Sequence, residues 1–202
     1  MTIMRKSGEE RREEIIQAVL DLAAERGVGQ VTAQAIADRV GIAQPTVFRH
    51  FKTRDAILRA ALEWIGRSVL TVLTPIFAGS GPADQRLRQL LSRQLHFISQ
   101  RKGLPRLLFS ERLHLEDPEL KAVVRRIMET YTGRVRVLLD EGVDEGRFRP
   151  DLDTEETARL ITALVQGLVM RWSISDFEFP LEAQGDALWR FLEPALVARW
   201  TP

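Results

Sequence analysis

Residues 41–52 read Gly-Ile-Ala-Gln-Pro-Thr-Val-Phe-Arg-His-Phe-Lys, and this stretch decides how the first part of the chain folds. A glycine leads into a short segment that mixes apolar anchors with Gln44, Thr46, Arg49 and His50. Polar groups interrupt the predicted helix on most sides, so it is poorly suited to a core. Amide, hydroxyl and guanidinium groups on such a helix can instead read base edges and phosphates in the major groove of DNA.

The residues before this stretch predict two more helices. Apolar residues recur at helical spacing from Ile15 to Ala23, and Gly27 ends that run. Thr32 is expected to cap a second helix that ends at Gly41, where the glycine lets the backbone turn sharply. Together with the helix quoted above, three short helices joined in this way define a helix-turn-helix.

The outward side chains of this motif suit contact with DNA. Gln44 can pair with adenine through two hydrogen bonds, and Thr46 can meet a thymine methyl group or a phosphate. Pro45 costs little in the first helical turn, where its missing N–H would have no partner. Lys52 is near enough to reach phosphates. Further cations expected to do so are Arg5, Lys6 and Arg54.

The chain as a whole carries little net charge. It has 202 residues, with 29 Lys and Arg, 28 Asp and Glu, and a formal net charge of +1. DNA binding must therefore come from local charge. The absence of cysteine excludes disulfides, thiolate metal sites and cysteine nucleophiles. No apolar run is long enough to span a bilayer and no signal core follows the first charges, so we expect a soluble, cytoplasmic protein.

Helical patterns continue through the rest of the chain, and we predict an all-α fold of roughly nine helices. Thr53 is expected to cap a fourth helix over about 54–75, which Pro75 breaks. Residues 79–82 read as a linker, and Pro180 is expected to open the last helix. Other helix starts are indicated by three side-chain pairs: Ser7 with Glu10, Asp117 with Pro118, and Asp153 with Glu156.

Residues 15–58 resemble the DNA-binding domain of TetR-family transcriptional regulators. The resemblance is densest after the turn, at Thr46-Val47-Phe48-Arg49-His50-Phe51-Lys52. In that family the sequence there is typically Thr-Leu-Tyr-x-His-Phe followed by a lysine or arginine. Two departures concern phosphate anchoring: Phe48 lacks the hydroxyl of the usual tyrosine, and Ala43 replaces a frequent capping serine.

The resemblance implies a helix-turn-helix domain over residues 1–53 and an effector-binding and dimerisation domain over 54–202, connected by the helix at 54–75. It also implies a repressor that a small effector releases from its operator. Effector binding would change the pose of the connecting helix and the separation of two recognition helices, which lowers operator affinity. The sequence leaves the effector, the operator, the regulated genes and the choice between repression and activation open.

The resemblance places recognition of double-stranded DNA on one set of side chains. We expect Gln44 and Thr46 to meet base edges. His50 and Lys52 are expected to meet phosphates, and Arg49 can serve either role. The full set is Thr32, Gln44, Pro45, Thr46, Phe48, Arg49, His50 and Lys52.

The last two predicted helices are strongly apolar and carry small residues that permit close approach of helices. Members of the family dimerise through a four-helix bundle made of two such helices from each subunit. A homodimer also suits a palindromic operator, because two recognition helices then meet half-sites about one DNA turn apart. The alternative is that these helices form the core of a monomeric domain. The interface candidates are Ile161, Leu164, Val165, Leu168, Leu188, Trp189 and Leu192.

A mostly apolar cavity with a few polar groups is the usual form of a small-molecule site. Its candidate lining residues, each of which can also be simple core filler, are Trp64, His96, Phe97, Phe109, Met128, Tyr131, Gln166, Met170 and Trp172. Their aromatic and methionine side chains favour a hydrophobic or amphipathic effector. We expect no cofactor and no metal site, because His96 has no carboxylate near it in sequence and His114 has only Glu111 at helical spacing.

Two other classes of function compete with this interpretation. An enzyme is not expected, because the chain lacks a Gly-x-Ser-x-Gly elbow, a Walker loop, a dinucleotide fingerprint and a His-Glu-x-x-His motif. A DNA-binding factor controlled by a protein partner, with no small-molecule effector, remains open. A closed apolar cavity between the middle helices would favour an effector, and a solid core there would favour a protein partner.

Overall fold

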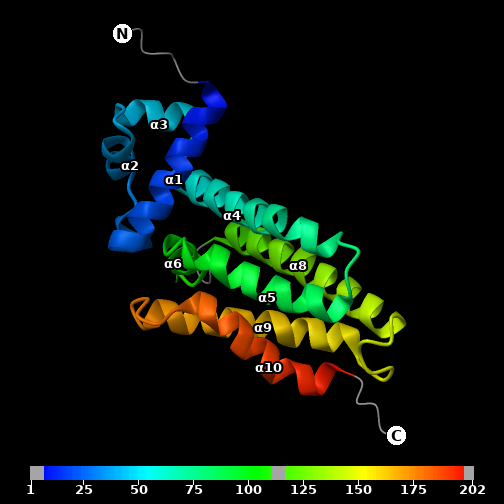
Figure 1. The fold of residues 1–202 in the computed structure, drawn as a ribbon. Coiled ribbons are helices and arrows are strands. Elements are labelled where there is room, and N and C mark those ends of the chain that lie inside the picture. The colour runs from blue at the N-terminus through cyan, green and yellow to red at the C-terminus, as the bar shows by residue number, and fades with distance from the viewer. Residues whose placement is uncertain (1–6, 111–116, 198–202) are drawn as a thin grey trace, which may run out of the picture. The chain divides into compact units, whose positions relative to one another are not determined.

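A computed structural model of the chain describes residues 7–110 and 117–197. Within these residues it contains nine α-helices, two short 3-10 segments and one isolated β-bridge between Phe148 and Val197, so the expected all-α class is confirmed (Figure 1). None of the described helices is long and apolar enough to cross a bilayer. In chain order the elements are α1 (Gly8–Arg26), η1 (Val28–Gln30), α2 (Ala33–Val40), α3 (Gln44–His50), α4 (Arg54–Phe77), α5 (Ala83–Ser99), α6 (Gly103–Leu108), α8 (Pro118–Asp144), α9 (Thr154–Ile174), η2 (Leu181–Ala183) and α10 (Gln184–Leu196).

Side chains cap the predicted helix starts and satisfy backbone N–H groups that a helix leaves without partners. Ser7 and Glu10 form a reciprocal capping box at α1: the Glu10 N–H donates to Ser7 Oγ at 3.2 Å, and the Ser7 N–H donates to Glu10 Oε2 at 2.7 Å. At the start of α8, Asp117 Oδ1 accepts from the N–H groups of Glu119 and Leu120.

The start of α9 forms only half of the predicted capping box. Asp153 Oδ1 accepts from the Glu156 N–H at 2.9 Å, but the Glu156 carboxylate accepts from Arg159 Nε at 3.0 Å instead of turning back. The last helix also starts later than predicted, because Pro180 precedes the short η2 and α10 begins only at Gln184.

Helix α4 ends two residues later than the sequence predicts. It continues to Phe77 with Pro75 inside its last turn, because a proline removes one backbone donor without stopping a helix this close to its end. The Arg86 guanidinium donates to the carbonyl oxygens of Ile76, at 2.9 Å, and of Phe77. The helix therefore ends where a buried arginine binds the carbonyl groups of its last two residues.

The chain divides into two compact units, which are described separately. Unit 1 comprises the described residues up to Gly66 together with the described residues of the range 101–124. Unit 2 comprises Arg67–Gln100 and the described residues from Arg125 onward. Unit 1 therefore extends past residue 53, because α6, far along the chain, packs against α1.

In unit 1, α1, α2 and α3 enclose a small apolar core at the blue end of the ribbon (Figure 1). Ile15, Ile36 and Val47 have no exposed surface. Helix α6 approaches α1 so closely that a Cβ atom at Gly103 would lie 2.0 Å from the carbonyl oxygen of Leu20. Only a glycine permits this approach without displacing the backbone.

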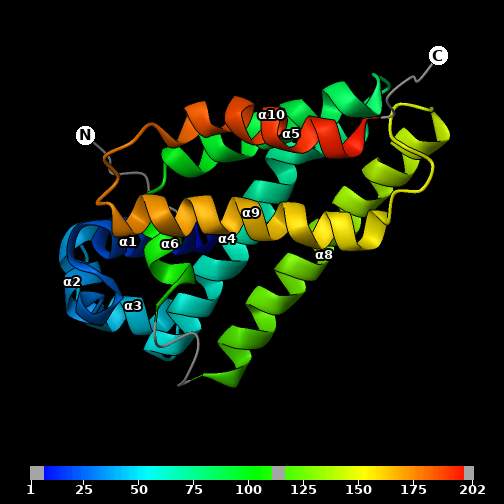
Figure 2. The same ribbon diagram turned by 90° about the horizontal axis from the view of Figure 1, so that it is seen from below.

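In unit 2, α5 packs along α10, and Figure 2 draws the two helices side by side. At Gly185 an added Cβ atom would lie 2.7 Å from Ser92 Cα, so α10 lies as close to α5 as a glycine allows. The core of α5 consists of four leucines with no exposed surface: Leu87, Leu90, Leu91 and Leu95.

Candidate nucleic-acid interface and effector region

The predicted helix-turn-helix is formed by α2 and α3. Thr32 Oγ1 caps α2 by accepting from the Ala35 N–H at 3.1 Å. Gly41 ends the helix in the left-handed region, at φ 71° and ψ 40°, which glycine adopts without strain. The Ile42 N–H donates to the Ala37 carbonyl at 3.0 Å and closes the turn that sets the direction of α3.

Helix α3 buries Val47 and exposes most of the residues predicted to contact DNA. Phe48 keeps 43% of its surface in solvent, so its ring is accessible to a partner. Gln44, Pro45 and Arg49 are also exposed, as are Thr32 and Lys52 outside the helix, while Thr46 and His50 are half-buried.

Two of the predicted DNA-contacting side chains on α3 interact with each other. Arg49 Nη2 donates to Thr46 Oγ1 at 3.3 Å. Ala43, which has no polar side chain, leaves the helix without a side-chain cap, and the Thr46 N–H donates to the Ala43 carbonyl at 2.8 Å. The start of α3 is therefore held by backbone hydrogen bonding alone.

Arg12 of α1 holds the end of α3. Its Nη1 donates to the His50 carbonyl at 2.6 Å, and its guanidinium lies 4.2 Å from the centroid of the Phe51 ring, a favourable cation–π distance. These contacts fix the backbone beside Lys52, so the cation at the end of the motif projects from a rigid support.

Arg54 has a structural role that the sequence did not predict, and its expected contact with a phosphate stays a prediction. Its guanidinium donates to the carbonyl oxygens of Val28 at 2.6 Å, Gly29 at 3.2 Å and Val31 at 2.7 Å. These bonds use Nε and Nη2 and tie the start of α4 to η1. Two further cations expected at phosphates lie outside the described residues: Arg5 and Lys6.

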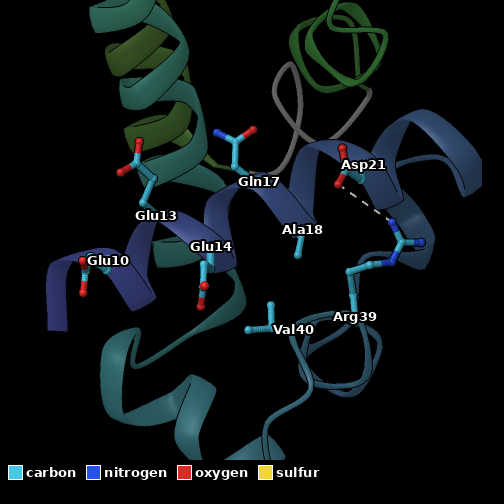
Figure 3. Close-up of a pocket in the computed structure, with 8 residues that line it drawn as sticks. All are labelled: Glu10, Glu13, Glu14, Gln17, Ala18, Asp21, Arg39 and Val40. Carbon is cyan, nitrogen blue, oxygen red and sulfur yellow. Dashed lines mark ion pairs between the residues drawn. The ribbon is translucent and has the colours of Figure 1, made fainter. Parts of the chain in front are cut away.

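A cleft of about 620 Å³ between α1 and the end of α2 is acidic (Figure 3). Arg39, the cation in its lining, lies 3.9 Å from Asp21 and donates twice to Glu25, at 3.0 and 2.5 Å. The hydrogen bond from Arg39 holds the pKa of the Glu25 carboxyl below its usual value. This face carries excess negative charge, which does not suit contact with phosphates. The other acidic lining residues are Glu10, Glu13 and Glu14.

The nine effector-pocket candidates are divided between the two units. Trp64 and Phe109 belong to unit 1, where Trp64 Nε1 donates to Glu13 Oε1 at 3.3 Å. In unit 2, His96 and Met170 are exposed, and His96 Nδ1 lies 3.0 Å from Glu182 Oε2. The buried candidates of unit 2 are Phe97, Tyr131 and Trp172, and the half-buried ones are Met128 and Gln166. Among the described residues, no group of three or more His, Asp or Glu side chains is placed to hold a metal ion.

The sequence-based set misses Gln94, which unit 2 buries together with Tyr131. The Tyr131 hydroxyl donates to Gln94 Oε1, and Gln94 is only 7% exposed. Burial raises the pKa of the Tyr131 phenol, and the hydrogen bond to Gln94 acts in the opposite direction. The signal for Gln94 was a polar residue at an apolar position of an amphipathic helix.

The seven dimer-interface candidates lie mostly inside the protomer. Ile161, Val165, Leu188, Trp189 and Leu192 are buried, and Leu164 and Leu168 are half-buried. The same two helices leave other large apolar residues exposed: Leu160, Met170, Ile174 and Phe191. On α9 the exposed residues recur at every third or fourth position together with Ala163 and Gly167, so they share one face of the helix.

The fold and the exposed α3 define a DNA-binding protein of the helix-turn-helix class. Residues 15–61 match the model of bacterial regulatory proteins of the tetR family, and residues 83–197 match the C-terminal domain of BetI-type transcriptional repressors. The chain therefore belongs to the TetR family of DNA-binding transcriptional regulators, whose members bind DNA and form dimers.

Among its relatives is the nucleoid occlusion factor SlmA of Vibrio cholerae, which is 28% identical over 184 residues, covering 90% of this chain and 93% of the relative. The fatty acid degradation regulator FadR of Bacillus halodurans has a similar fold, with a TM-score of 0.84 at 21% identity over 96% of this chain and all of that one. FadR of Bacillus subtilis, in complex with stearoyl-CoA, has a TM-score of 0.79 at 21% identity over 89% and 96% of the two chains.

Proposed function

We propose that the protein is a homodimeric repressor that reads a palindromic operator with two copies of α3 and leaves it when a small effector binds. The observation that carries this proposal is the exposed face of α3, where Gln44, Phe48 and Arg49 project from a helix anchored by the buried Val47. Because the chain has a net charge of only +1, a few well-placed groups, presented twice, must supply the specificity.

The proposal gives each polar residue of the motif a role. Gln44 and Arg49 contact base edges, the amide favouring adenine and the guanidinium favouring guanine. Thr46 orients the guanidinium through the hydrogen bond that it already accepts from Arg49. Phosphates are contacted by Thr32, His50 and Lys52, which position the helix in the groove without reading sequence.

We place the dimer interface on the outer faces of α9 and α10. A partner subunit there would cover Leu160, Ile174 and Phe191, of which Ile174 and Phe191 are about 70% exposed. Covering such a side chain stabilises the dimer by about 1.5–3 kcal/mol. Ala163 and Gly167, on the same face of α9, allow the close approach that a helical bundle needs. The seven residues expected from sequence then support these faces from inside the protomer.

The effector is proposed to be small and largely hydrophobic and to bind beside Tyr131 and Gln94. Their hydroxyl and amide groups are buried in a unit whose core is mostly apolar, and a small-molecule site usually has a few polar groups of this kind in an apolar lining. The stearoyl-CoA bound to the similarly folded FadR of Bacillus subtilis supports a ligand with a large apolar part.

Helix α4 is the proposed connection between effector and DNA. It runs unbroken from Arg54, which ties it to η1, to Phe77, whose carbonyl accepts from Arg86. An effector that binds one pose of α4 more tightly shifts the population of molecules toward that pose. Operator affinity then falls by at most the ratio of the effector's affinities for the two poses. Linkage then requires the operator to weaken effector binding by an equal factor.

The test begins with selection of duplexes from a random pool, followed by fluorescence anisotropy on the enriched sequence. The enriched site should be palindromic. Arg49→Ala and Gln44→Ala should each weaken binding by about 1–3 kcal/mol, which is roughly 5- to 150-fold. The matched controls Arg93→Ala and Gln85→Ala remove the same side chains from exposed positions on α5 and should bind as wild type. Undiminished affinity in both α3 variants would overturn the proposal.

Control by a protein partner alone is the less favoured alternative. It predicts that operator affinity responds to no small molecule. A thermal-shift screen that finds a stabilising compound, followed by anisotropy showing that the compound releases the operator, would support the repressor.

A further inference from the structure

Unit 2 carries a groove on its surface that borders the buried Tyr131 through Phe77 without including Tyr131 in its lining. It has a volume of about 410 Å³ and lies between the last turn of α4 and the middle of α8. None of the nine effector-pocket candidates lines it. The volume falls in the lower part of the range of small-molecule sites, which is about 300–1,000 Å³.

The floor of the groove is apolar and held in place. Phe77, from the last turn of α4, contacts Tyr131 edge-to-face with ring centroids 6.5 Å apart, so its ring is braced by a buried residue. Val137 and Leu138 of α8 continue the apolar surface, and Val137 is 51% exposed. Water therefore covers an apolar surface that a ligand could cover instead.

A glycine keeps the groove open in the middle of α8. A Cβ atom at Gly133 would meet no atom within 4 Å outside its own helix segment. Glycine inside a helix costs roughly 0.5–1 kcal/mol relative to alanine, and neither close packing nor a positive φ requires it here. The empty space that it leaves lies next to Arg134 and one turn before Val137.

Arg134 is the cation of the groove, and it has no carboxylate partner among the described residues. Its Nη1 donates to Thr74 Oγ1 at 3.3 Å, and its guanidinium lies 5.8 Å from the centroid of the Phe77 ring. The two carboxylates in the lining are already paired: Glu141 with Arg86 at 2.5 Å and Glu129 with Arg125 at 3.8 Å. Arg134 is therefore the charge that a ligand can compensate.

We propose that this groove binds a small amphipathic carboxylate, with its carboxylate on Arg134 and its apolar body over Phe77 and Val137. A guanidinium offers two parallel donors to a carboxylate, which a neutral or cationic head group cannot accept in the same way. The ligand would also contact Thr74 and Ala78 at the end of α4.

The experiment is isothermal titration of the full chain, free of DNA, with octanoate, octan-1-ol and octyltrimethylammonium. Octanoate should bind at one site per chain, and the other two compounds should bind at least about tenfold more weakly, because they lose a charge-assisted hydrogen bond. Absence of octanoate binding to wild type at millimolar concentration would overturn the proposal, as would equal binding of all three compounds.

Three variants locate the site. Gly133→Leu fills the groove and should abolish octanoate binding, while Arg134→Gln should weaken it about tenfold or more. Arg136→Gln is the matched control, since Arg136 is exposed on the same helix and paired with Asp140 at 3.7 Å. It should bind octanoate as wild type does. Wild-type affinity in both Gly133→Leu and Arg134→Gln would place the ligand elsewhere and overturn the assignment.

The operator test separates this inference from the proposed function. Gly133→Leu, without ligand, should bind the selected duplex as wild type does, since Gly133 is far along the chain from α3 and its space is open. If the wild-type protein selected no duplex, the repressor proposal would fail. The octanoate titrations would still test the groove, because they use the protein free of DNA.

Discussion

Units 1 and 2 both brace their folds with arginine, which is half-buried in unit 1 and buried in unit 2. In unit 1, Arg12 and Arg54 bind backbone carbonyls and brace the motif, which leaves Arg49 exposed on α3 for a partner. In unit 2, Arg86 and Gln94 are buried and bind partners within the unit. The role of each of these polar residues therefore depends on its tertiary partners. Its neighbours in the sequence do not identify those partners.

The largest expected effect on stability concerns the close packing of α6 on α1 in unit 1. Gly103→Ala places a Cβ atom against the Leu20 carbonyl oxygen, so it should lower the free energy of unfolding by about 3 kcal/mol, measured by urea denaturation. The matched control is Gly133→Ala in unit 2, because an added Cβ atom there meets open space. This variant should be neutral or stabilising by up to about 1 kcal/mol. Equal midpoints for the two variants would contradict the close packing of α6 on α1.

The buried arginine of unit 2 should matter more than an exposed one on the same helix. Arg86→Met removes three hydrogen bonds, takes the guanidinium donor from the Phe77 carbonyl and leaves the Ile76 carbonyl with the Gly79 N–H at 3.4 Å. It should cost about 2–3 kcal/mol, allowing for the partial exposure of Glu141. Arg88→Met breaks an exposed pair with Asp186 and should cost about 0–1 kcal/mol. If both variants lost a similar free energy of unfolding, measured by heat or urea, the distinction between the buried and the exposed arginine would be wrong.

Two neighbouring cations of unit 1 should separate stability from DNA binding. Arg54→Gln loses the hydrogen bonds to η1, so it should lower the free energy of unfolding by about 2 kcal/mol. Lys52→Gln should leave unfolding unchanged, weaken operator binding for all sequences, and reduce the slope of log affinity against log salt by about 1. A stability loss in Lys52→Gln and none in Arg54→Gln would reverse the roles assigned to them.

The smallest expected effect is a pH dependence in unit 2. The pKa of the buried Tyr131 phenol is higher in the folded protein than its value of about 10 in an unfolded chain. The contribution of this phenol to the free energy of unfolding is therefore full below about pH 10. It decreases as the pH rises above about 10, because the phenol loses its proton in the unfolded chain before it does so in the folded protein. Tyr131→Phe should flatten the fall in melting temperature above pH 10. An unchanged slope would mean that this phenol does not cause it.

Local signals were sufficient to predict the helix-turn-helix. The cap at Thr32, the left-handed turn at Gly41 and the buried Val47 depend on residues a few positions apart, so the sequence predicted α2, α3 and the exposed side of α3. The role of Arg54 was missed because its partners lie 23 to 26 residues away, in η1 and just beyond it. A local pattern carries no information about such a contact.

The faces of unit 2 were harder to predict for a different reason. Helix α9 has apolar residues on more than one side, so its periodicity does not separate the buried Ile161 and Val165 from the exposed Leu160 and Ile174. Which side is buried depends on packing within unit 2. The roles of Gln94 and Gly133 depend on the same packing. Gln94 matters because it is buried, and Gly133 matters because it leaves open space beside its helix.

The central claim is that two copies of α3, held by one dimer, read two half-sites on the same face of the DNA. The most direct measurement is the affinity of the full chain for its selected duplex and for a duplex with five base pairs inserted between the half-sites. The insertion turns one half-site to the opposite face, so affinity should fall about a hundredfold or more as only one α3 can engage. Equal affinity for the two duplexes would contradict the account.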